Sequence, residues 1–376
     1  MRIDRRTAAH YTSKHVREVQ VKIGLGLYRK MLNRESYRFA RQMGCTHIVI
    51  HLVDYDRQAE ASAAGANQPV GTVAGGWGIA GDPGALWTTE ELLAIRKEIE
   101  SEGLKIEAIE NFDPVFWHDI LLDGPKKAVQ LEGIKRLVRS IGKAGIPIMG
   151  YNFSIAGVAG RVTGRFARGG AESVGVHGVD ETPLPLGMVW NMIYDRNAPK
   201  GTLPSISSTE LWQRFEDFLK VMLPVAEEAG VKMALHPDDP PAATVRSTPR
   251  LVYKPELYQR VIEIDPSPSN MLEFCLGTIA EMADGDVYEA TERYSRQGRL
   301  AYVHFRNVRG KIPDYEETFV DEGDVDMFRI LRILKRNHYS GVIIPDHTPL
   351  PDCGAPWHAG MAYALGYIRA ALRTLE

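Results

Sequence analysis

Eight short apolar segments recur along the chain, and a stretch with helical spacing follows each of them. Short apolar runs without a polar alternation are typical of strands that are buried on both faces. Strands of this kind, joined by helices, predict a parallel sheet with helices packed against it. The predicted strands span residues 21–27, 47–52, 105–110, 147–153, 231–235, 270–276, 300–308 and 341–345.

Capping residues and terminal glycines mark the intervening helices. Thr88 and Glu91 have the spacing of a capping box, and Gly103 is expected to end the helix that they begin. Gly145 and Gly230 are expected to end two further helices. The predicted helices span residues 35–43, 88–102, 126–144, 208–230, 255–264, 278–296, 325–337 and 355–376.

Eight strand–helix units in one chain predict an α/β fold, a (β/α)8 TIM barrel. The alternative is an open doubly wound sheet, but its glycine fingerprint is missing, because Gly24-Leu25-Gly26 lacks a third glycine and lies inside a predicted strand. We expect one barrel domain over residues 1–376, with an N-terminal arm at 1–20 and long insertions at 56–86 and 154–207. Both insertions follow strands, so we expect them on the C-terminal rim, where barrel active sites lie.

Charge and composition argue against several classes of partner. A formal net charge of −3 gives no electrostatic reason to expect binding to nucleic acid or to an anionic membrane. No apolar run reaches the roughly 18–20 residues that cross a bilayer. Three cysteines argue against a disulfide framework and favour a cytoplasmic location. The polar residues 1–20 are typical of an arm that packs on a partner subunit, so we expect a homo-oligomer, a dimer or a tetramer.

Four of the predicted strands end on or beside a side chain that can bind a metal. His236 follows the apolar residues 231–235 and begins a proline-rich loop. The next three strands end on Cys275, His304 and Asp346. Because the carboxyl ends of successive barrel strands lie side by side, these side chains are expected to converge. Two imidazoles, a thiolate and a carboxylate suit Mn²⁺, Fe²⁺, Co²⁺ or Zn²⁺ better than Ca²⁺ or Mg²⁺.

Each of these residues has an ordinary structural interpretation when it is taken alone. A buried cysteine is more often a small core residue than a ligand, and a histidine at a strand end is more often a hydrogen-bonded polar group. Four such residues on four successive strands are hard to obtain by chance, so we expect a metal site. Cys45, in a helix–strand turn, and Cys353, in a loop, are interpreted as structural.

Five short motifs carry a resemblance to a known family. The chain resembles the mannonate dehydratases, which are related to xylose-isomerase-like barrels. The first motif is quite specific, and weaker likeness extends over residues 107–153. The motifs are His236-Pro237-Asp238-Asp239-Pro240-Pro241, Phe274-Cys275-Leu276-Gly277-Thr278, His304-Phe305-Arg306-Asn307, Gly323-Asp324-Val325-Asp326-Met327 and Pro345-Asp346-His347.

The resemblance implies a hydro-lyase that depends on Mn²⁺ or Fe²⁺. Such an enzyme dehydrates a sugar acid, D-mannonate or a related aldonate, to a 2-keto-3-deoxy acid. By motif position, the resemblance assigns the metal ligands as His236, Cys275, His304 and Asp346. It assigns the role of catalytic acid and base to His347. It also favours the oligomer.

Dehydration of a sugar acid removes the proton next to the carboxylate and expels the hydroxyl one carbon further on. A divalent cation on the carboxylate would stabilise the resulting enediolate, and a histidine is suited to protonate the leaving hydroxyl. His347 is the first candidate for proton transfer and Tyr151 the second. The predicted substrate-binding residues are Arg306, Asn307, Glu110 and His118.

Several positions depart from the family pattern. The first strand has Gly24-Leu25-Gly26-Leu27 in place of an Arg-Trp-Tyr-Gly stretch. Phe319-Val320-Asp321-Glu322 replaces a histidine-rich run, and Thr348 replaces a glycine. The metal ligands are kept while the surroundings of the substrate differ. A metal-dependent sugar isomerase or epimerase, and a non-catalytic barrel that binds a metal or a sugar, are therefore the alternatives.

Overall fold

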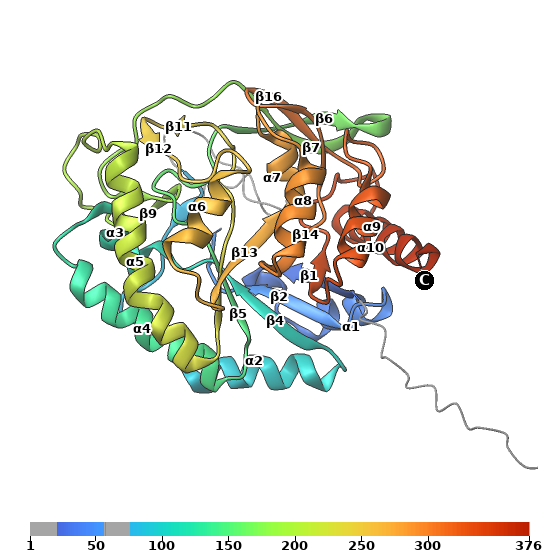
Figure 1. The fold of residues 1–376 in the computed structure, drawn as a ribbon, viewed down its shortest axis with the longest axis horizontal. Helices are drawn as coiled ribbons and strands as arrows, with labels where there is room; N and C mark the ends of the chain where they lie inside the picture. Colours follow the sequence, from blue (N-terminus) through green and yellow to red (C-terminus); the bar gives the residue numbers. More distant parts are fainter. Residues whose placement is uncertain (1–20, 56, 58–75, 376) are drawn as a thin grey trace, which may run out of the picture.

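The centre of the molecule is a closed barrel of eight parallel strands (Figure 1). The computed structural model describes residues 21–55, 57 and 76–375, so the predicted arm at 1–20 and most of the 56–86 insertion lie outside it. The predicted α/β barrel is confirmed, since successive barrel strands pair in parallel and β1 pairs with β17 to close the ring. The barrel strands are β1 Lys22–Leu27, β2 His47–His51, β4 Lys105–Glu110, β5 Ile148–Tyr151, β10 Lys232–Leu235, β13 Asn270–Cys275, β14 Leu300–His304 and β17 Val342–Ile344.

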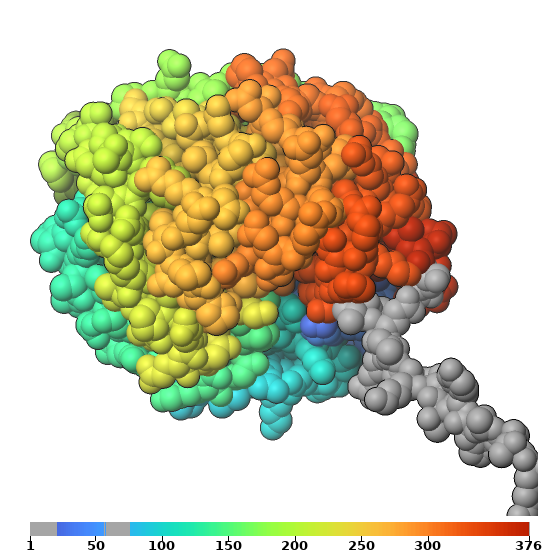
Figure 2. Space-filling view, in the orientation of Figure 1, coloured from blue at the N-terminus to red at the C-terminus, as the bar shows by residue number. Residues whose placement is uncertain are grey.

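Helices form a layer around the barrel (Figure 1). The predicted capping box at Thr88 is present, and a second one at Ser207 begins the longest helix. In the space-filling view, side chains from the yellow to red part of the chain cover the strands (Figure 2). None of the helices in the described ranges is long and apolar enough to span a membrane. The helices of this layer are α1 Arg34–Gln42, α2 Thr89–Ser101, α4 Lys127–Lys143, α5 Ser208–Ala229, α6 Leu257–Ile264, α8 Val287–Arg296, α9 Met327–Arg336 and α10 Pro356–Thr374.

Apolar side chains pack on both sides of the barrel wall. One large cluster joins the outward faces of the strands to the helices. A separate cluster comes from the strands alone, and so fills the barrel interior beneath the C-terminal mouth. β1 contributes little to it. Gly24 of β1 has no side chain, and there is no room for one, because a Cβ there would lie 2.6 Å from Val342 Cγ1. The interior cluster is Val49, Ala108, Ile148, Ala234, Met271, Ala301, Tyr302, Val342 and Ile344.

Short helices and small sheets build the rim at the C-terminal ends of the strands. Residues 309–323, predicted as a charged loop, instead belong largely to a β-hairpin that pairs with a second hairpin from the 154–207 insertion. The predicted helix 278–296 is two helices, α7 and α8, separated by residues 282–286. The rim elements are α3 Pro114–Leu122, α7 Leu276–Glu281, β3 Gly78–Ile79, β6 Arg161–Ala167, β7 Ala171–His177, β8 Met188–Val189, β9 Met192–Ile193, β11 Thr244–Val245, β12 Thr248–Pro249, β15 Asn307–Lys311 and β16 Asp314–Thr318.

The close crossing of α4 and α5 generates a test of the packing. A Cβ at Gly142 of α4 would lie 2.3 Å from the carbonyl oxygen of Ala229 at the end of α5, so Gly142→Ala must push the helices apart. We expect it to lower the free energy of unfolding by about 1–3 kcal/mol. Gly366→Ala in α10 has no such neighbour within 4 Å and should raise this free energy by about 0.5–1 kcal/mol. Urea unfolding midpoints measure both changes, and equal effects would contradict this account of the crossing.

Candidate functional site

The four predicted metal ligands meet at the C-terminal mouth of the barrel. His236 follows β10, Cys275 and His304 end β13 and β14, and Asp346 lies two residues beyond β17. Each of His236, Cys275 and His304 offers one ligand atom, and these atoms all lie within 4.8 Å of one another. Asp346 completes the group, with one carboxylate oxygen 3.6 Å from His304 Nδ1 and the other 3.9 Å from Cys275 Sγ. The fold therefore brings these four side chains together.

The electrostatics of this group favour a positive charge among its members. Burial lowers the pKa values of His236 and His304, but the neighbouring thiolate and carboxylates outweigh burial and raise them, that of His236 to about 9. Burial raises the pKa of the Cys275 thiol, but the positive charge of Arg306 and the nearby imidazoles of His236 and His304 outweigh burial and lower it to about 5. Cys275 is therefore a thiolate at neutral pH, which is the form that binds metals. His236 Nδ1 lies 2.6 Å from the carbonyl oxygen of Pro237, so an Nδ1–H can donate there and leave Nε2 free to coordinate.

His304 gives a second indication that the residues fit a metal. Its side chain is 2% exposed, and neither ring nitrogen has a hydrogen-bond partner within the described ranges. A buried imidazole without partners is costly. A cation bound at Nδ1, beside Asp346, would satisfy one of the two nitrogens. The donor set and this orphaned nitrogen together fit a divalent transition metal.

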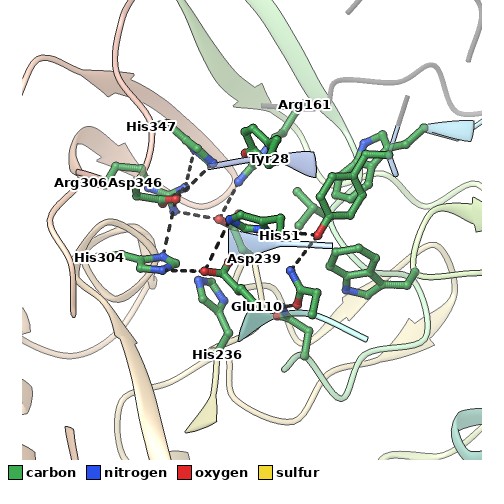
Figure 3. Close-up of a pocket in the computed structure, with 16 residues that line it drawn as sticks. Tyr28, His51, Glu110, Arg161, His236, Asp239, His304, Arg306, Asp346 and His347 are labelled. Carbon is green, nitrogen blue, oxygen red and sulfur yellow. Dashed lines mark hydrogen bonds and ion pairs between the residues drawn. The ribbon is translucent and has the colours of Figure 1, made fainter. Parts of the chain in front are cut away.

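His347 follows Asp346 directly and faces the same cavity (Figure 3). Its Nδ1 lies 3.1 Å from Glu317 of β16, and its Nε2 lies 3.3 Å from Asp346. Burial raises the pKa of Glu317, but the charges of His347 and Arg306 outweigh burial and lower it. The Glu317 carboxylate can therefore accept a hydrogen bond from His347 Nδ1–H, which fixes the orientation of the ring.

Arg306 lines the cavity, as the substrate-binding prediction required, but its guanidinium is already used by the protein. The group is 1% exposed. Nη2 donates to Asp239 at 2.8 Å and to Glu281 at 3.1 Å, and Nη1 donates to Glu317 at 3.1 Å. Asp346 lies 3.3 Å from Nη1. Arg306 thus holds carboxylates of the site in place.

Glu110, at the end of β4, lines the cavity on the side of His304. Its Oε2 lies 3.3 Å from His304 Nε2, accepts a hydrogen bond from Tyr302 at 3.3 Å, and lies 3.7 Å from His51 Nε2. Glu273 of β13 lies on the other side of the same nitrogen, with Oε1 at 3.3 Å. Glu273 is fully buried, and neither of its carboxylate oxygens has a hydrogen-bond partner in the described part of the chain.

The cavity has one charged wall and one aromatic wall. Trp77 and Trp190 pack edge to face at 5.2 Å, and Tyr55 packs against both. Trp77 belongs to the first insertion and Trp190 to the second. Tyr28, just after β1, stacks near His51, with 4.7 Å between ring centroids. The charged wall is formed by Glu110, Arg161, His236, Asp239, His304, Arg306, Asp346 and His347 (Figure 3).

Tyr151, predicted as the second proton-transfer residue, does not line the cavity. The flanking residues take the inward positions, since Asn152 lines the cavity and a Cβ at Gly150 would meet groups inside the barrel. Alternation along the strand therefore turns Tyr151 outward, where it is buried against Phe218 of α5 at 5.9 Å. The side chain lies among the aromatic residues between barrel and helices.

Two of the predicted substrate-binding residues also lie elsewhere. His118 is on α3 and stacks on Tyr194, with ring centroids 4.0 Å apart. Asn307 donates from its amide to the carbonyls of Val320 and Val325, which ties the end of the hairpin to the start of α9. Both side chains have structural contacts of their own, and neither lines the cavity.

Several residues that line the cavity or contact its lining were not predicted from the sequence. His51 ends β2 just as His304 ends β14, so the strand-end pattern already marked it. Glu273 sits within an apolar run, and Glu317 sits in a segment predicted as loop, so neither carried a signal of this kind. Arg161 reaches the cavity from β6 and pairs with Asp239 at 2.8 Å.

Comparisons with known proteins agree with the resemblance seen in the motifs. The D-mannonate dehydratase family model matches residues 51–166 and 197–363. The mannonate dehydratase of Streptococcus suis strain 05ZYH33 is 32% identical over 282 residues, which cover 70% of this chain and 75% of that protein. The enzyme of Lactococcus lactis subsp. cremoris is 29% identical over 326 residues, covering 78% and 88%.

A solved structure shares the fold. The crystal structure of mannonate dehydratase from Streptococcus suis serotype 2 superposes with a TM-score of 0.71 at 24% identity, covering 94% of this chain and 95% of that one. An L-ribulose 3-epimerase superposes with a TM-score of 0.55 at 15% identity, over 94% and 95% of the two chains. Sequence and fold therefore place the chain in the mannonate dehydratase family of hydro-lyases.

Proposed function

We propose that this protein is a metal-dependent dehydratase that converts a sugar acid, D-mannonate or a related aldonate, to a 2-keto-3-deoxy acid. The observation that carries the proposal is the convergence of His236, Cys275, His304 and Asp346 at the barrel mouth, beside the cavity that His347 lines. The family membership supplies the reaction class. The geometry supports roles for particular residues, which we propose in turn.

The four strand-end residues would hold a divalent cation, Mn²⁺ or Fe²⁺ by the resemblance and Co²⁺ or Zn²⁺ by ligand type alone. The bound cation would polarise the substrate carboxylate and so acidify the neighbouring C–H bond. The Cys275 thiolate and the Asp346 carboxylate supply two negative charges to the site, which favours a divalent over a monovalent ion. Burial raises the pKa of Asp346, but the positive charges of His347, His304 and Arg306 outweigh burial and hold it well below its usual range.

His347 is placed to protonate the leaving hydroxyl. With Nδ1 held by Glu317 at 3.1 Å, Nε2 is the nitrogen that faces the ligand Asp346. A proton carried on Nε2 would therefore lie beside the carboxylate of the substrate and the carbons next to it. General acid catalysis by a positioned histidine contributes about 10²–10⁴-fold to a rate.

A second group must remove the proton next to the substrate carboxylate, and His51 is the better placed base. His51 lines the cavity from β2. Burial lowers its pKa although Glu110 opposes this, so the imidazole is neutral and able to accept a proton. Tyr28 lies beside it, but burial raises the pKa of its hydroxyl, which makes Tyr28 a poor base.

Substrate hydroxyls and carboxylate would be held between the two walls of the cavity. Arg161 brings a positive charge to the charged wall, and Asn111 and Asn152 bring amides. Asn152 donates to Asn111 Oδ1 at 2.8 Å, so the two amides are oriented by each other. Trp77 and Trp190 would exclude water from the opposite side. The lining mixes few oriented polar groups with aromatic surface, which is typical of small-molecule sites.

A product assay tests the reaction class. We expect protein loaded with Mn²⁺ or Fe²⁺ to form a 2-keto-3-deoxy acid from at least one member of a panel of epimeric aldonic acids. The panel also includes free ketoses, which an isomerase or epimerase on this barrel would convert. Epimerised sugar without dehydration would refute the dehydratase, and no turnover of any compound with any of the four metals would favour a binding barrel.

Replacement of His347 tests the general acid. We expect His347→Gln to lower kcat by about 10²–10⁴-fold while metal content is unchanged, because proton transfer is lost and the ligands remain. His177→Gln, on the exposed part of β7, is the matched control and should keep wild-type kcat. Activity of His347→Gln within twofold of wild type would show that another group carries the proton.

Metal removal and replacement of Cys275 test the ligand set. A chelator should abolish turnover, and Mn²⁺ or Fe²⁺ should restore it. Cys275→Ser should weaken metal binding by more than about tenfold, because a neutral hydroxyl replaces a thiolate. Cys353→Ser, at an exposed loop cysteine, should bind metal as the wild type does. Equal metal affinity in the two variants would remove Cys275 from the ligand set.

A further inference from the structure

Carboxylates lie beside both nitrogens of the His304 imidazole. On one side, Nδ1 faces Asp346 at 3.6 Å, where the metal is proposed. On the other side, Nε2 lies 3.3 Å from Glu110 and 3.3 Å from Glu273 (Glu110 and His304 in Figure 3). The side chains of His304, Glu110 and Glu273 are 2%, 8% and 0% exposed, so water has little access to this contact.

We propose that Glu110 and Glu273 are positioning residues that accept the Nε2–H of His304 and thereby present Nδ1 to the metal ion. The inference rests on the proposed metal site and assigns the side of the imidazole that binds it. A metal-bound histidine commonly donates its other N–H to a carboxylate, which fixes the tautomer and makes the ligand more basic.

The strand geometry places both carboxylates on the correct face. Glu273 lies two residues before Cys275 on β13, so both side chains point to the barrel interior. Glu110 ends β4 on the opposite side of the ring. Gly150 of β5 leaves the space that this arrangement needs, because a Cβ there would lie 2.3 Å from Glu273 Oε2 and 2.2 Å from the Tyr302 hydroxyl.

The environment of the two Glu273 carboxylate oxygens indicates that this residue orients a ligand and does not only fill space. Both are fully buried and without a hydrogen-bond partner in the described ranges, although a buried carboxylate in that state is costly. The Tyr302 hydroxyl lies beside both acids and donates to Glu110 at 3.3 Å. A proton fixed on His304 Nε2 gives Glu273 Oε1 a donor at 3.3 Å.

A second cation held by Glu110, Glu273 and His304 is the competing arrangement, since one ligand atom from each lies within 4.8 Å of the others. That arrangement requires lone pairs on both ring nitrogens of His304 while a metal also occupies the site beside Asp346. A neutral imidazole has only one such lone pair. The geometry therefore favours one ion per chain, with a proton on Nε2.

Metal titration tests the assignment without depending on catalysis. Wild type, Glu110→Gln, Glu273→Gln and Glu273→Ala are titrated with Co²⁺, whose absorption reports coordination by the Cys275 thiolate, and metal per chain is measured after equilibrium dialysis. We expect one ion per wild-type chain and a dissociation constant that rises about 10–100-fold in the Glu110 and Glu273 variants. The spectrum at saturation should also shift, because the basicity of the His304 ligand changes.

Glu107→Gln is the matched control, because Glu107 is a buried carboxylate of the same strand β4 that pairs with Lys22 and His47 instead. It should bind Co²⁺ with wild-type affinity and spectrum. Comparison of thermal unfolding without metal separates misfolding from a loss of affinity, and Glu273→Gln serves where Glu273→Ala does not fold.

Wild-type affinity and spectrum in both Gln variants, or two ions per wild-type chain, would overturn the assignment. The proposed function is tested separately, by the dehydration assay. Wild-type protein that binds one ion but dehydrates no sugar acid refutes the function and leaves the assignment standing. Dehydration by the wild type together with unchanged metal binding in the variants supports the function and refutes the assignment of Glu110 and Glu273.

Discussion

The buried guanidinium of Arg306 is the interaction on which the site depends. It lies within ion-pair distance of four carboxylates that come from four different segments of the chain. Removing a charge from water costs several kcal/mol unless it is paired, so these segments stabilise one another only together. Without Arg306, the repulsion between buried acids would push apart the elements that carry the cavity. The carboxylates belong to Asp239 after β10, Glu281 of α7, Glu317 of β16 and Asp346 after β17.

The sequence predicted that Arg306 binds the substrate. In the structure its guanidinium instead pairs with carboxylates of the protein. An arginine two residues beyond a metal ligand has the right position for substrate binding, and it does line the cavity. The sequence does not show that Glu281 of α7 and Glu317 of β16 reach the same point. Arg161, which reaches the cavity from the rim hairpin, is likewise paired with Asp239 at 2.8 Å.

The barrel and the convergence of the four candidate ligands could be predicted from the sequence because both depend on local patterns. Continuous apolar runs indicated buried parallel strands, and a polar residue directly after such a run indicated a side chain at the barrel mouth. Glu273 could not be predicted in this way, because it lies inside the apolar run of β13, where an acidic side chain is expected only if another group pairs with it. The outward direction of Tyr151 was not evident for a related reason. Alternation along a strand shows which side chains point inward only if their neighbours are clearly apolar or polar, and Gly150 is neither. The β15–β16 hairpin was missed because its pairing partner, β7, lies more than a hundred residues earlier.

The candidate metal ligands and the aromatic wall of the cavity come from different parts of the chain. The candidate ligands and the carboxylates around His304 lie in barrel strands or within two residues of their ends, and the register of these strands is fixed by pairing on both sides. The aromatic wall and Arg161 come from the insertions, and these pack on each other through Trp77 and Trp190 and through pairing of β3 with β9. A change in one insertion must therefore reshape the wall that the other presents to the substrate. The insertions therefore set the shape of the aromatic wall together with Tyr28, which follows β1 and lines the same cavity.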